Sequence, residues 1–210
     1  MKYKIVPVTH YAQNCSLIIC EKTAKGALID PGGEVEKLLQ CVKQENIQLE
    51  KILLTHGHFD HVGGAKEIAL RLNIPIIGPA VEDKFWIDRL PEDGRLTGFG
   101  ELQSFTPTQW LSDGDLVTVG ELVLSVLCCP GHTPGHVVFI NEANQLAFVG
   151  DVLFKDSIGR TDFPMGDHET LISSIKNKLI PLGDDITFVP GHGPTSTFGR
   201  ERLYNPFIAE

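Results

Sequence analysis

Short apolar runs separated by polar turns open the chain. Three of these runs have the length and apolar content of β-strands. We therefore predict an antiparallel meander whose strands cover residues 2–8, 14–20 and 26–30.

A helical pattern follows the meander. Apolar side chains recur at helical spacing on one face at Val35, Leu38, Leu39 and Val42. This spacing predicts an amphipathic helix over residues 34–45. The pattern then predicts four further elements: a strand at 52–54, a helix at 65–73, a short strand at 74–78 and a helix at 81–90.

Residues 91–108 interrupt this succession of strands and helices. Glycines and prolines recur there among mostly polar residues, and they favour turns and loops. We predict a long connection, for which two interpretations stay open. Long loops are often lids over functional sites, but a surface loop without a function fits equally well.

A second β-rich region fills most of the remaining chain. The predicted strands are 116–119, 122–128, 137–141, 146–149 and, last, 186–189. Before the last strand, apolar spacing predicts a helix over 169–179, with Asp167 as its N-cap. Residues 200–210 show no clear pattern.

The two halves repeat one order of elements: a meander, a helix and a strand. Two facing sheets with helices on their outer sides would bury all these strands, so the predicted fold class is α/β in layers. With 210 residues, 42% of them hydrophobic, the chain suits one domain with a sizeable core. We expect residues 1–210 to form that single domain.

Composition and charge narrow the function classes. No apolar run has membrane-spanning length, and the N-terminus lacks the features of a signal peptide, so we expect a cytoplasmic protein without a membrane partner. The net charge of −9 argues against nucleic acid as a partner, since phosphate contacts need basic patches. Five cysteines, an odd number, predict buried thiols rather than a disulfide framework.

The candidate chemistry is concentrated directly after the strand at 52–54. His56, His58, Asp60 and His61 lie within six consecutive positions. Each buried polar group needs a partner, and a metal ion satisfies all four at once. Imidazole and carboxylate suit zinc, iron and manganese. Because Asp60 and His61 are offset from the two alternating histidines, the stretch can supply two neighbouring ions.

Three later strand ends carry the same local design, an apolar strand followed by a glycine-bearing turn and a metal-type ligand. These turns add three donors, and the complete candidate set is His56, His58, Asp60, His61, His132, Asp151 and His192. One tetrahedral zinc ion needs only about four ligands. Seven donors therefore indicate two ions that share a bridging carboxylate.

Four further polar residues lie near these motifs. We expect His136 to pack or to make a hydrogen bond near His132, and Asp30 to support a ligand or to cap a turn. His168 is expected to be exposed in the first turn of a helix. His10 lies in a loop, and its role is left open.

The motifs resemble those of the metallo-β-lactamase superfamily. Residues 55–61, Thr-His-Gly-His-Phe-Asp-His, are similar to its T-H-x-H-x-D-H pattern, and the later donors match in order. The resemblance implies a four-layered αβ/βα sandwich. It also implies the ligand sets: His56, His58 and His132 for one metal, Asp60, His61 and His192 for the other, with Asp151 as the bridge. Zinc is the first choice for both ions, with iron and manganese as alternatives.

Within the superfamily the chain resembles glyoxalase II, the hydroxyacylglutathione hydrolases, in its short bacterial form. The supporting stretches are 13–15, 150–154, 159–163 and 190–193. By this resemblance Arg160 binds the glycine carboxylate of glutathione. The chain departs from the longer enzymes at Asp162 and Pro194, where they have aromatic residues. Only 18 residues follow His192, so we expect no separate C-terminal glutathione-binding helical domain.

The predicted function is that of a binuclear-metal thioester hydrolase. The resemblance implies S-lactoylglutathione as the substrate and D-lactate and glutathione as products, through attack of a metal-bound hydroxide that Asp60 orients. One alternative is a persulfide dioxygenase with a single iron held by His56, His132 and Asp151, because residues 159–163 resemble that family too. Others are hydrolysis of another small thioester or ester, and a metal-stabilised binding protein without turnover. The oligomeric state is left open.

Overall fold

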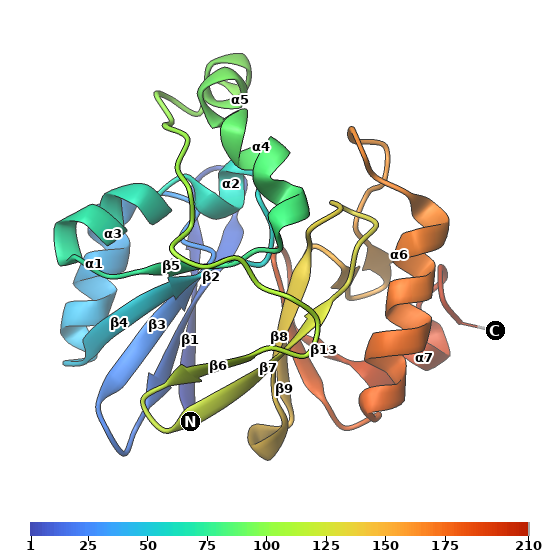
Figure 1. Ribbon diagram of the computed structural model, residues 1–210. Coiled ribbons are helices and arrows are strands. Elements are labelled where there is room, and N and C mark those ends of the chain that lie inside the picture. Colours follow the sequence, from blue (N-terminus) through green and yellow to red (C-terminus); the bar gives the residue numbers. More distant parts are fainter. Residues whose placement is uncertain (210) are drawn as a thin grey trace.

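Two β-sheets face each other at the centre of the structure, and helices cover both outer faces (Figure 1). The computed structural model describes residues 1–209. The first sheet has the strand order β1-β2-β3-β4-β5 and the second has the order β13-β12-β9-β8-β7-β6. This arrangement confirms the expected α/β fold class with the layer order αβ/βα.

The first sheet begins as the predicted meander. Its strands are β1 (Lys2–Val8), β2 (Gln13–Cys20), β3 (Lys25–Ile29), β4 (Gln48–Leu53) and β5 (Ile76–Ile77). The first three strands pair antiparallel, and β4 and β5 then add in parallel. The strand predicted at 52–54 begins earlier, at Gln48, and the strand predicted at 74–78 is shorter.

The second sheet contains all the strands predicted in the second half of the chain. They are β6 (Leu116–Val119), β7 (Leu122–Cys128), β8 (Val137–Asn141), β9 (Leu146–Gly150), β12 (Thr187–Pro190) and the additional β13 (Ser196–Thr197). The strands β6 to β9 pair antiparallel in chain order, whereas β12 lies parallel to β9. A separate hairpin, β10 (Leu153–Phe154) and β11 (Ser157–Ile158), follows β9.

The central strands bury both faces, because successive side chains of a strand point to opposite sides. Leu17 of β2 packs in a cluster under the helices, while Ile18 packs between the sheets. Phe139 of β8 belongs to the same middle layer as Ile18, and the adjacent Val138 packs on the other side, under the C-terminal helices. Three apolar layers therefore hold four layers of secondary structure together, and they explain the near-continuous apolar runs of the sequence.

The helices close the two outer layers (Figure 1). The elements are α1 (Val35–Gln44) and α3 (Ala65–Leu72) over the first sheet, and α6 (His168–Ser174), a π-helical continuation (Ile175–Leu179) and α7 (Phe198–Tyr204) over the second. The Asp167 carboxylate accepts a hydrogen bond from the Thr170 amide at 2.7 Å, so the predicted N-cap is confirmed. Among the described residues, no helix combines the length and the apolar character needed to cross a membrane.

The prediction of a helix at 81–90 followed by a long connection was wrong in detail. The structure has a 3₁₀ turn (Val81–Asp83), α4 (Lys84–Asp88) and α5 (Leu90–Thr97). Pro91 lies in the first turn of α5, where a missing backbone N–H removes no helical hydrogen bond. Gly94 packs so closely on the returning chain that a Cβ atom there would lie 2.5 Å from the Gly100 carbonyl oxygen. These two residues suggested a loop, but both are compatible with this helix.

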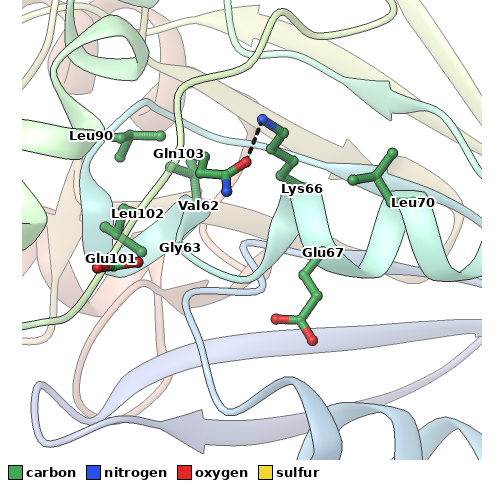
Figure 2. A pocket seen from close by; sticks show the side chains of 9 residues that line it. All are labelled: Val62, Gly63, Lys66, Glu67, Leu70, Leu90, Glu101, Leu102 and Gln103. Atoms are coloured by element: carbon green, nitrogen blue, oxygen red, sulfur yellow. Dashed lines mark hydrogen bonds between the residues drawn. The ribbon is translucent and has the colours of Figure 1, made fainter.

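The chain after α5 returns along α3 and is attached to it. The Lys66 ammonium donates hydrogen bonds to the Gln103 side chain at 2.9 Å and to the Ser104 carbonyl at 3.1 Å. Figure 2 shows the Lys66–Gln103 contact beside a shallow surface pocket that Leu90 and Leu102 also line. The second half of the predicted connection is therefore irregular but packed onto the helix layer.

The C-terminal region showed no sequence pattern. It is joined to the rest of the fold by hydrogen bonds to one buried carboxylate. Glu201 of α7 is fully buried. Its side chain accepts hydrogen bonds from the Asp156 amide at 2.8 Å, the Asn205 side chain at 3.0 Å and the Ser196 hydroxyl. These contacts join α7 to the turn between β10 and β11 and to β13.

We predict that Glu201→Ala lowers the free energy of unfolding by about 3 kcal/mol, because it leaves several buried donors without their charged acceptor. Urea unfolding of both proteins measures the difference. The control is Glu82→Ala, at an exposed position, which should change stability by less than about 0.5 kcal/mol. Equal stabilities for the two variants would contradict the assigned role of Glu201.

Candidate metal centre

Loops at one edge of the two sheets carry the predicted donors. The stretch 56–61 follows β4 of the first sheet, and His132, Asp151 and His192 follow β7, β9 and β12 of the second. These last three strands run in the same direction, so their C-terminal ends share an edge. A backbone hydrogen bond of 2.8 Å from Val137 to the Thr55 carbonyl joins the two sheets there. Loops distant in sequence therefore meet at one place.

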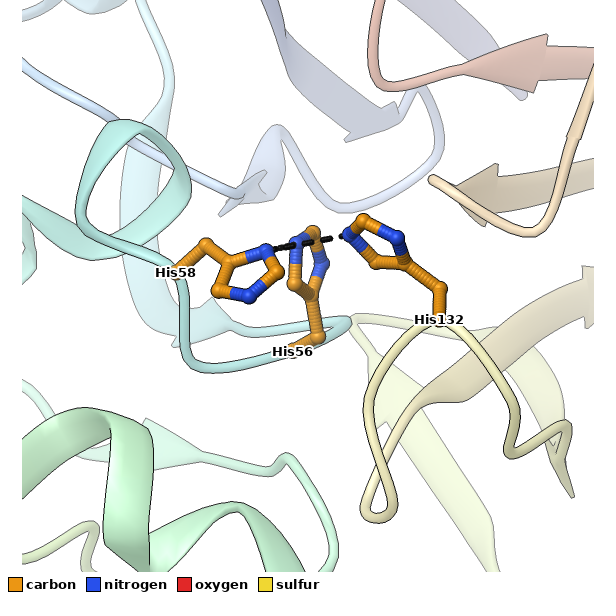
Figure 3. A group of neighbouring side chains, drawn as sticks. All are labelled: His56, His58 and His132. Atoms are coloured by element: carbon orange, nitrogen blue, oxygen red, sulfur yellow. Dashed lines mark hydrogen bonds between the residues drawn. The ribbon is translucent and has the colours of Figure 1, made fainter. Parts of the chain in front are cut away.

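The first group of donors consists of three buried imidazoles, His56, His58 and His132 (Figure 3). The distance from His58 Nδ1 to His56 Nε2 is 3.1 Å, and to His132 Nε2 it is 3.0 Å. Nitrogens bound to one tetrahedral zinc ion at about 2.1 Å lie about 3.4 Å apart. The three nitrogens thus have nearly the spacing that one shared cation needs.

Burial also sets the protonation state of this group. It holds the pKa of His56 and His58 well below the usual value, with a further contribution from the neighbouring imidazoles, and it lowers the pKa of His132. The rings are therefore neutral at neutral pH. Neutral imidazole is the form that binds metal ions.

The second group of donors consists of Asp60, His61 and His192. The distance from His192 Nε2 to the nearer Asp60 oxygen is 3.2 Å, and the corresponding distance for His61 Nε2 is 3.9 Å. This group lies at the same edge of the sheets but uses nitrogens and oxygens distinct from those of the first group. The structure thus brings these six residues together in the two sets of three that the resemblance implies.

Asp151 lies between the two groups. Its Oδ1 atom is 3.4 Å from His61 Nε2, and its Oδ2 atom is 3.7 Å from both His132 Nε2 and His192 Nε2. Although burial opposes the charged form, the surrounding imidazoles, His61 first, hold the pKa of Asp151 far below its usual value. Within the described residues, Oδ1 of Asp151 and Nε2 of His61 are buried without a hydrogen-bond partner. Such atoms fit a bound cation.

Two histidines are oriented by backbone carbonyl groups. His132 donates its Nδ1 proton to the Arg160 carbonyl at 2.8 Å, and His192 donates its Nδ1 proton to the Tyr11 carbonyl at 3.1 Å. A carbonyl oxygen can only accept, so each ring keeps its Nε2 lone pair for the centre.

Asp30 orients His61, and together with His56 and His61 it forms a third group of close, buried donors. Its Oδ2 atom accepts from His61 Nδ1 at 2.9 Å and from the Thr55 hydroxyl at 2.6 Å, while Oδ1 accepts from the Thr55 amide at 2.7 Å. Both carboxylate oxygens are thereby satisfied. This agrees with the expectation that Asp30 supports a ligand.

The other histidines lie outside the donor groups found in residues 1–209. The His136 ring stacks on His56 with ring centroids 4.7 Å apart, and its Nε2 atom accepts from the Asp151 amide at 3.1 Å. It therefore holds Asp151 in place. His168 is exposed at the start of α6, and His10 stacks on Tyr11 with centroids 4.2 Å apart.

Asn14 attaches the His192 loop to β2. Its side-chain amide donates to the Pro190 carbonyl at 3.1 Å and to the Gly193 carbonyl at 2.8 Å, and its backbone amide donates to Gly191 at 2.7 Å. Gly191 has no room for a side chain, because a Cβ atom would lie 2.1 Å from Asp151 Oδ1. These contacts give a physical reason for the Gln-Asn-Cys and Pro-Gly-His-Gly stretches.

Sequence reasoning missed Asp83, which is fully buried beside the centre. Its carboxylate accepts from the Gly57 amide at 2.8 Å, the Thr133 hydroxyl at 2.8 Å and the Gly135 amide at 2.6 Å. It thus ties the loop of His56 and His58 to the loop of His132. Burial raises its pKa to about 6, although the three donors act in the opposite direction. No local pattern distinguishes it from an exposed acidic residue.

Comparisons with known proteins agree with this geometry. Residues 8–192 match the family model of the metallo-beta-lactamase superfamily. A protein of Haemophilus influenzae named hydroxyacylglutathione hydrolase GloC is 46% identical over 99% of this chain and 98% of its own. The solved structure of BLEG-1 B3 metallo-beta-lactamase is similar with a TM-score of 0.92 and 34% identity, covering 100% of both chains. That of TTHA1623 in a di-iron-bound form has a TM-score of 0.88 and 34% identity, covering 98% and 100%.

We predict that Asp83→Ala lowers the free energy of unfolding by about 3 kcal/mol or more, since three buried donors lose one charged acceptor. Asp83→Asn should recover only part of this loss, because its side-chain oxygen still accepts hydrogen bonds whereas the NH₂ group that replaces the second carboxylate oxygen cannot. Thermal unfolding of the metal-free proteins measures both effects without contributions from bound ions.

The matched control for Asp83 is Asp88→Ala in α4, where the side chain is exposed and pairs with Lys84. Its effect should stay below about 1 kcal/mol. If Asp83→Ala proved as stable as this control, the assigned link between the two loops would be wrong.

Proposed function

Since this chain belongs to the metallo-beta-lactamase superfamily and is a metal-dependent hydrolase, we propose that it hydrolyses glutathione thioesters at a two-metal centre. The leading substrate is S-lactoylglutathione, which gives D-lactate and glutathione. The observation that carries the proposal is the meeting of two donor groups at Asp151. A hydrolytic two-metal centre needs two ions that share a ligand.

The proposed ligands follow the two groups. His56, His58 and His132 would hold one ion, Asp60, His61 and His192 would hold the other, and Asp151 would bridge them. We propose zinc for both, and the same donors accept iron or manganese. The relative named hydroxyacylglutathione hydrolase GloC supports the substrate class, and the di-iron form of TTHA1623 supports a two-metal centre.

Bound divalent cations supply a deprotonated water near neutral pH and polarise the carbonyl of the substrate. The side chains of the protein orient the attacking water. Asp60 lies in the second group, with its side chain 13% exposed and Oδ2 3.2 Å from His192 Nε2. Its carboxylate can accept a hydrogen bond from the attacking water and direct it to the thioester carbon. The water oxygen then joins the acyl carbon and the carbon–sulfur bond breaks, so that the acyl group leaves as D-lactate and glutathione leaves as its thiolate.

Aromatic side chains form the wall beside the first group. The Trp86 ring lies 4.4 Å from the His58 ring, and the Phe163 ring lies 5.0 Å from it. On the other side, Tyr11 packs edge-on against Phe59 at 5.2 Å. These rings would pack against the acyl group and exclude bulk water, which strengthens electrostatic interactions in the site.

We predict that the purified protein hydrolyses S-lactoylglutathione and that Asp60→Asn lowers kcat by about 100-fold or more, as expected for loss of a group that orients and activates water. Steady-state kinetics with metal analysis of each sample measures this. The control is Asp88→Asn, an exposed residue of α4, which should leave kcat unchanged.

Different substrates separate this proposal from its alternatives. Oxygen uptake with glutathione persulfide and no thioester hydrolysis would replace it with a dioxygenase. Hydrolysis of a cephalosporin alone would favour a β-lactamase, as the similarity to BLEG-1 invites. Full metal content without turnover on any of these substrates would indicate a binding protein.

We also predict two metal ions per chain in protein loaded with zinc, and about one in His192→Ala. The variant keeps the three imidazoles of the first group, whereas the second group loses one of its two imidazoles. Elemental analysis counts the ions. Two ions retained in His192→Ala would show that His192 is not needed for the second site.

A further inference from the structure

We infer that Asp162 determines substrate specificity by occupying the carboxylate-binding edge of Arg160. The inference rests on the proposed function and refines it. Arg160 is the residue expected to bind the glycine carboxylate of glutathione. In this chain the Arg160 guanidinium already pairs with the carboxylate of Asp162, two residues later in the sequence. Arg160 therefore binds the terminal carboxylate of a substrate only weakly.

The contact between the two side chains is bidentate. Arg160 Nε donates to Asp162 Oδ1 at 2.6 Å, and Arg160 Nη2 donates to Asp162 Oδ2 at 2.6 Å. Two parallel N–H···O bonds of this kind are also the arrangement in which a guanidinium binds a substrate carboxylate. A substrate carboxylate must therefore displace the Asp162 carboxylate, or bind at the remaining edge of the Arg160 guanidinium, close to the negative charge of Asp162.

Arg160 is placed where a substrate would reach it. Its guanidinium lies 4.2 Å above the Phe163 ring, and that ring lies 5.0 Å from His58 and 6.0 Å from His132. The Arg160 carbonyl accepts the His132 proton, so its backbone is fixed at the centre. One ring thus separates the guanidinium from the first donor group. From a thioester at the centre, an extended cysteinyl-glycine unit spans about 7 Å, which suits this separation.

The ion pair between Arg160 and Asp162 contributes little to the stability of the fold. The Arg160 and Asp162 side chains are 60% and 68% exposed, and ion pairs between exposed side chains contribute little to folding. The pair therefore does not hold the fold together. The pair acts instead on anions that approach Arg160. These anions meet a guanidinium whose charge is already neutralised, and they compete with the Asp162 carboxylate.

The consequence concerns the substrate class. A thioester whose thiol carrier ends in a carboxylate gains little from Arg160, so one without this group should be hydrolysed almost as well. The acyl group and the thioester itself, which lie against the centre and its aromatic wall, then account for most of the recognition.

The test compares S-lactoylglutathione with the same thioester in which the glycine carboxylate is an amide. We expect Asp162→Asn to lower KM for the carboxylate form by about three- to tenfold, while kcat and the KM of the amide stay unchanged. The difference should shrink in about 1 M salt, because screening weakens exposed charges. Adding Arg160→Gln to Asp162→Asn should abolish the gain.

The matched control is Asp156→Asn, which removes an exposed carboxylate paired with Arg200 instead. It should change neither KM value. An unchanged KM for both substrates in Asp162→Asn, or an equal fall for both, would overturn the role of Asp162 while leaving thioester hydrolysis in place.

Binding measurements keep the two proposals separable. If the wild-type protein hydrolyses neither thioester, the proposed function fails, and calorimetry with S-hexylglutathione and its glycine amide then tests Asp162. A three- to tenfold lower Kd for the carboxylate form in Asp162→Asn would support the inference. Equal Kd values in the variant and the wild type would overturn it.

Discussion

The cost of burying charged and polar side chains is the constraint on which this structure depends. Asp151 is ionised and buried among imidazoles, and its Oδ1 atom has no hydrogen-bond partner within residues 1–209. In a low-dielectric interior such groups need compensation. The fold provides this compensation by orienting three imidazole rings. His132, His192 and His61 each donate one ring proton to an acceptor outside the space between the donors. The opposite nitrogens are thereby left facing a common space.

This arrangement explains why residues far from the reaction matter for the site. The donors lie on loops from two different sheets, and loops alone would not hold them at ligand spacing. Asp83 ties the two loops of the first donor group, and Asn14 holds the loop of His192. The arrangement of the donor groups thus depends on buried hydrogen bonds from residues that are not donors themselves.

Substrate recognition depends on different physics from that of the centre. The donor groups are buried and strongly coupled, whereas Arg160 and Asp162 are exposed at the rim and interact through water-screened charges. Under the proposed function, a change at the rim therefore alters which thioester binds without disturbing the centre.

The sequence by itself determined those features that depend on local spacing. Short apolar runs indicated the strands, the Asp167 cap indicated a helix start, and the spacing within 55–61 indicated the donors, because each signal lies within a few residues. Tertiary structure alone decided the rest. Helix α5 forms although Pro91 and Gly94 suggest a loop, since the helix packs on the returning chain. Asp83 is buried by contacts with loops that are 26 and more positions away. Such contacts leave no local trace, because they depend on which distant backbone donors the fold brings to a side chain.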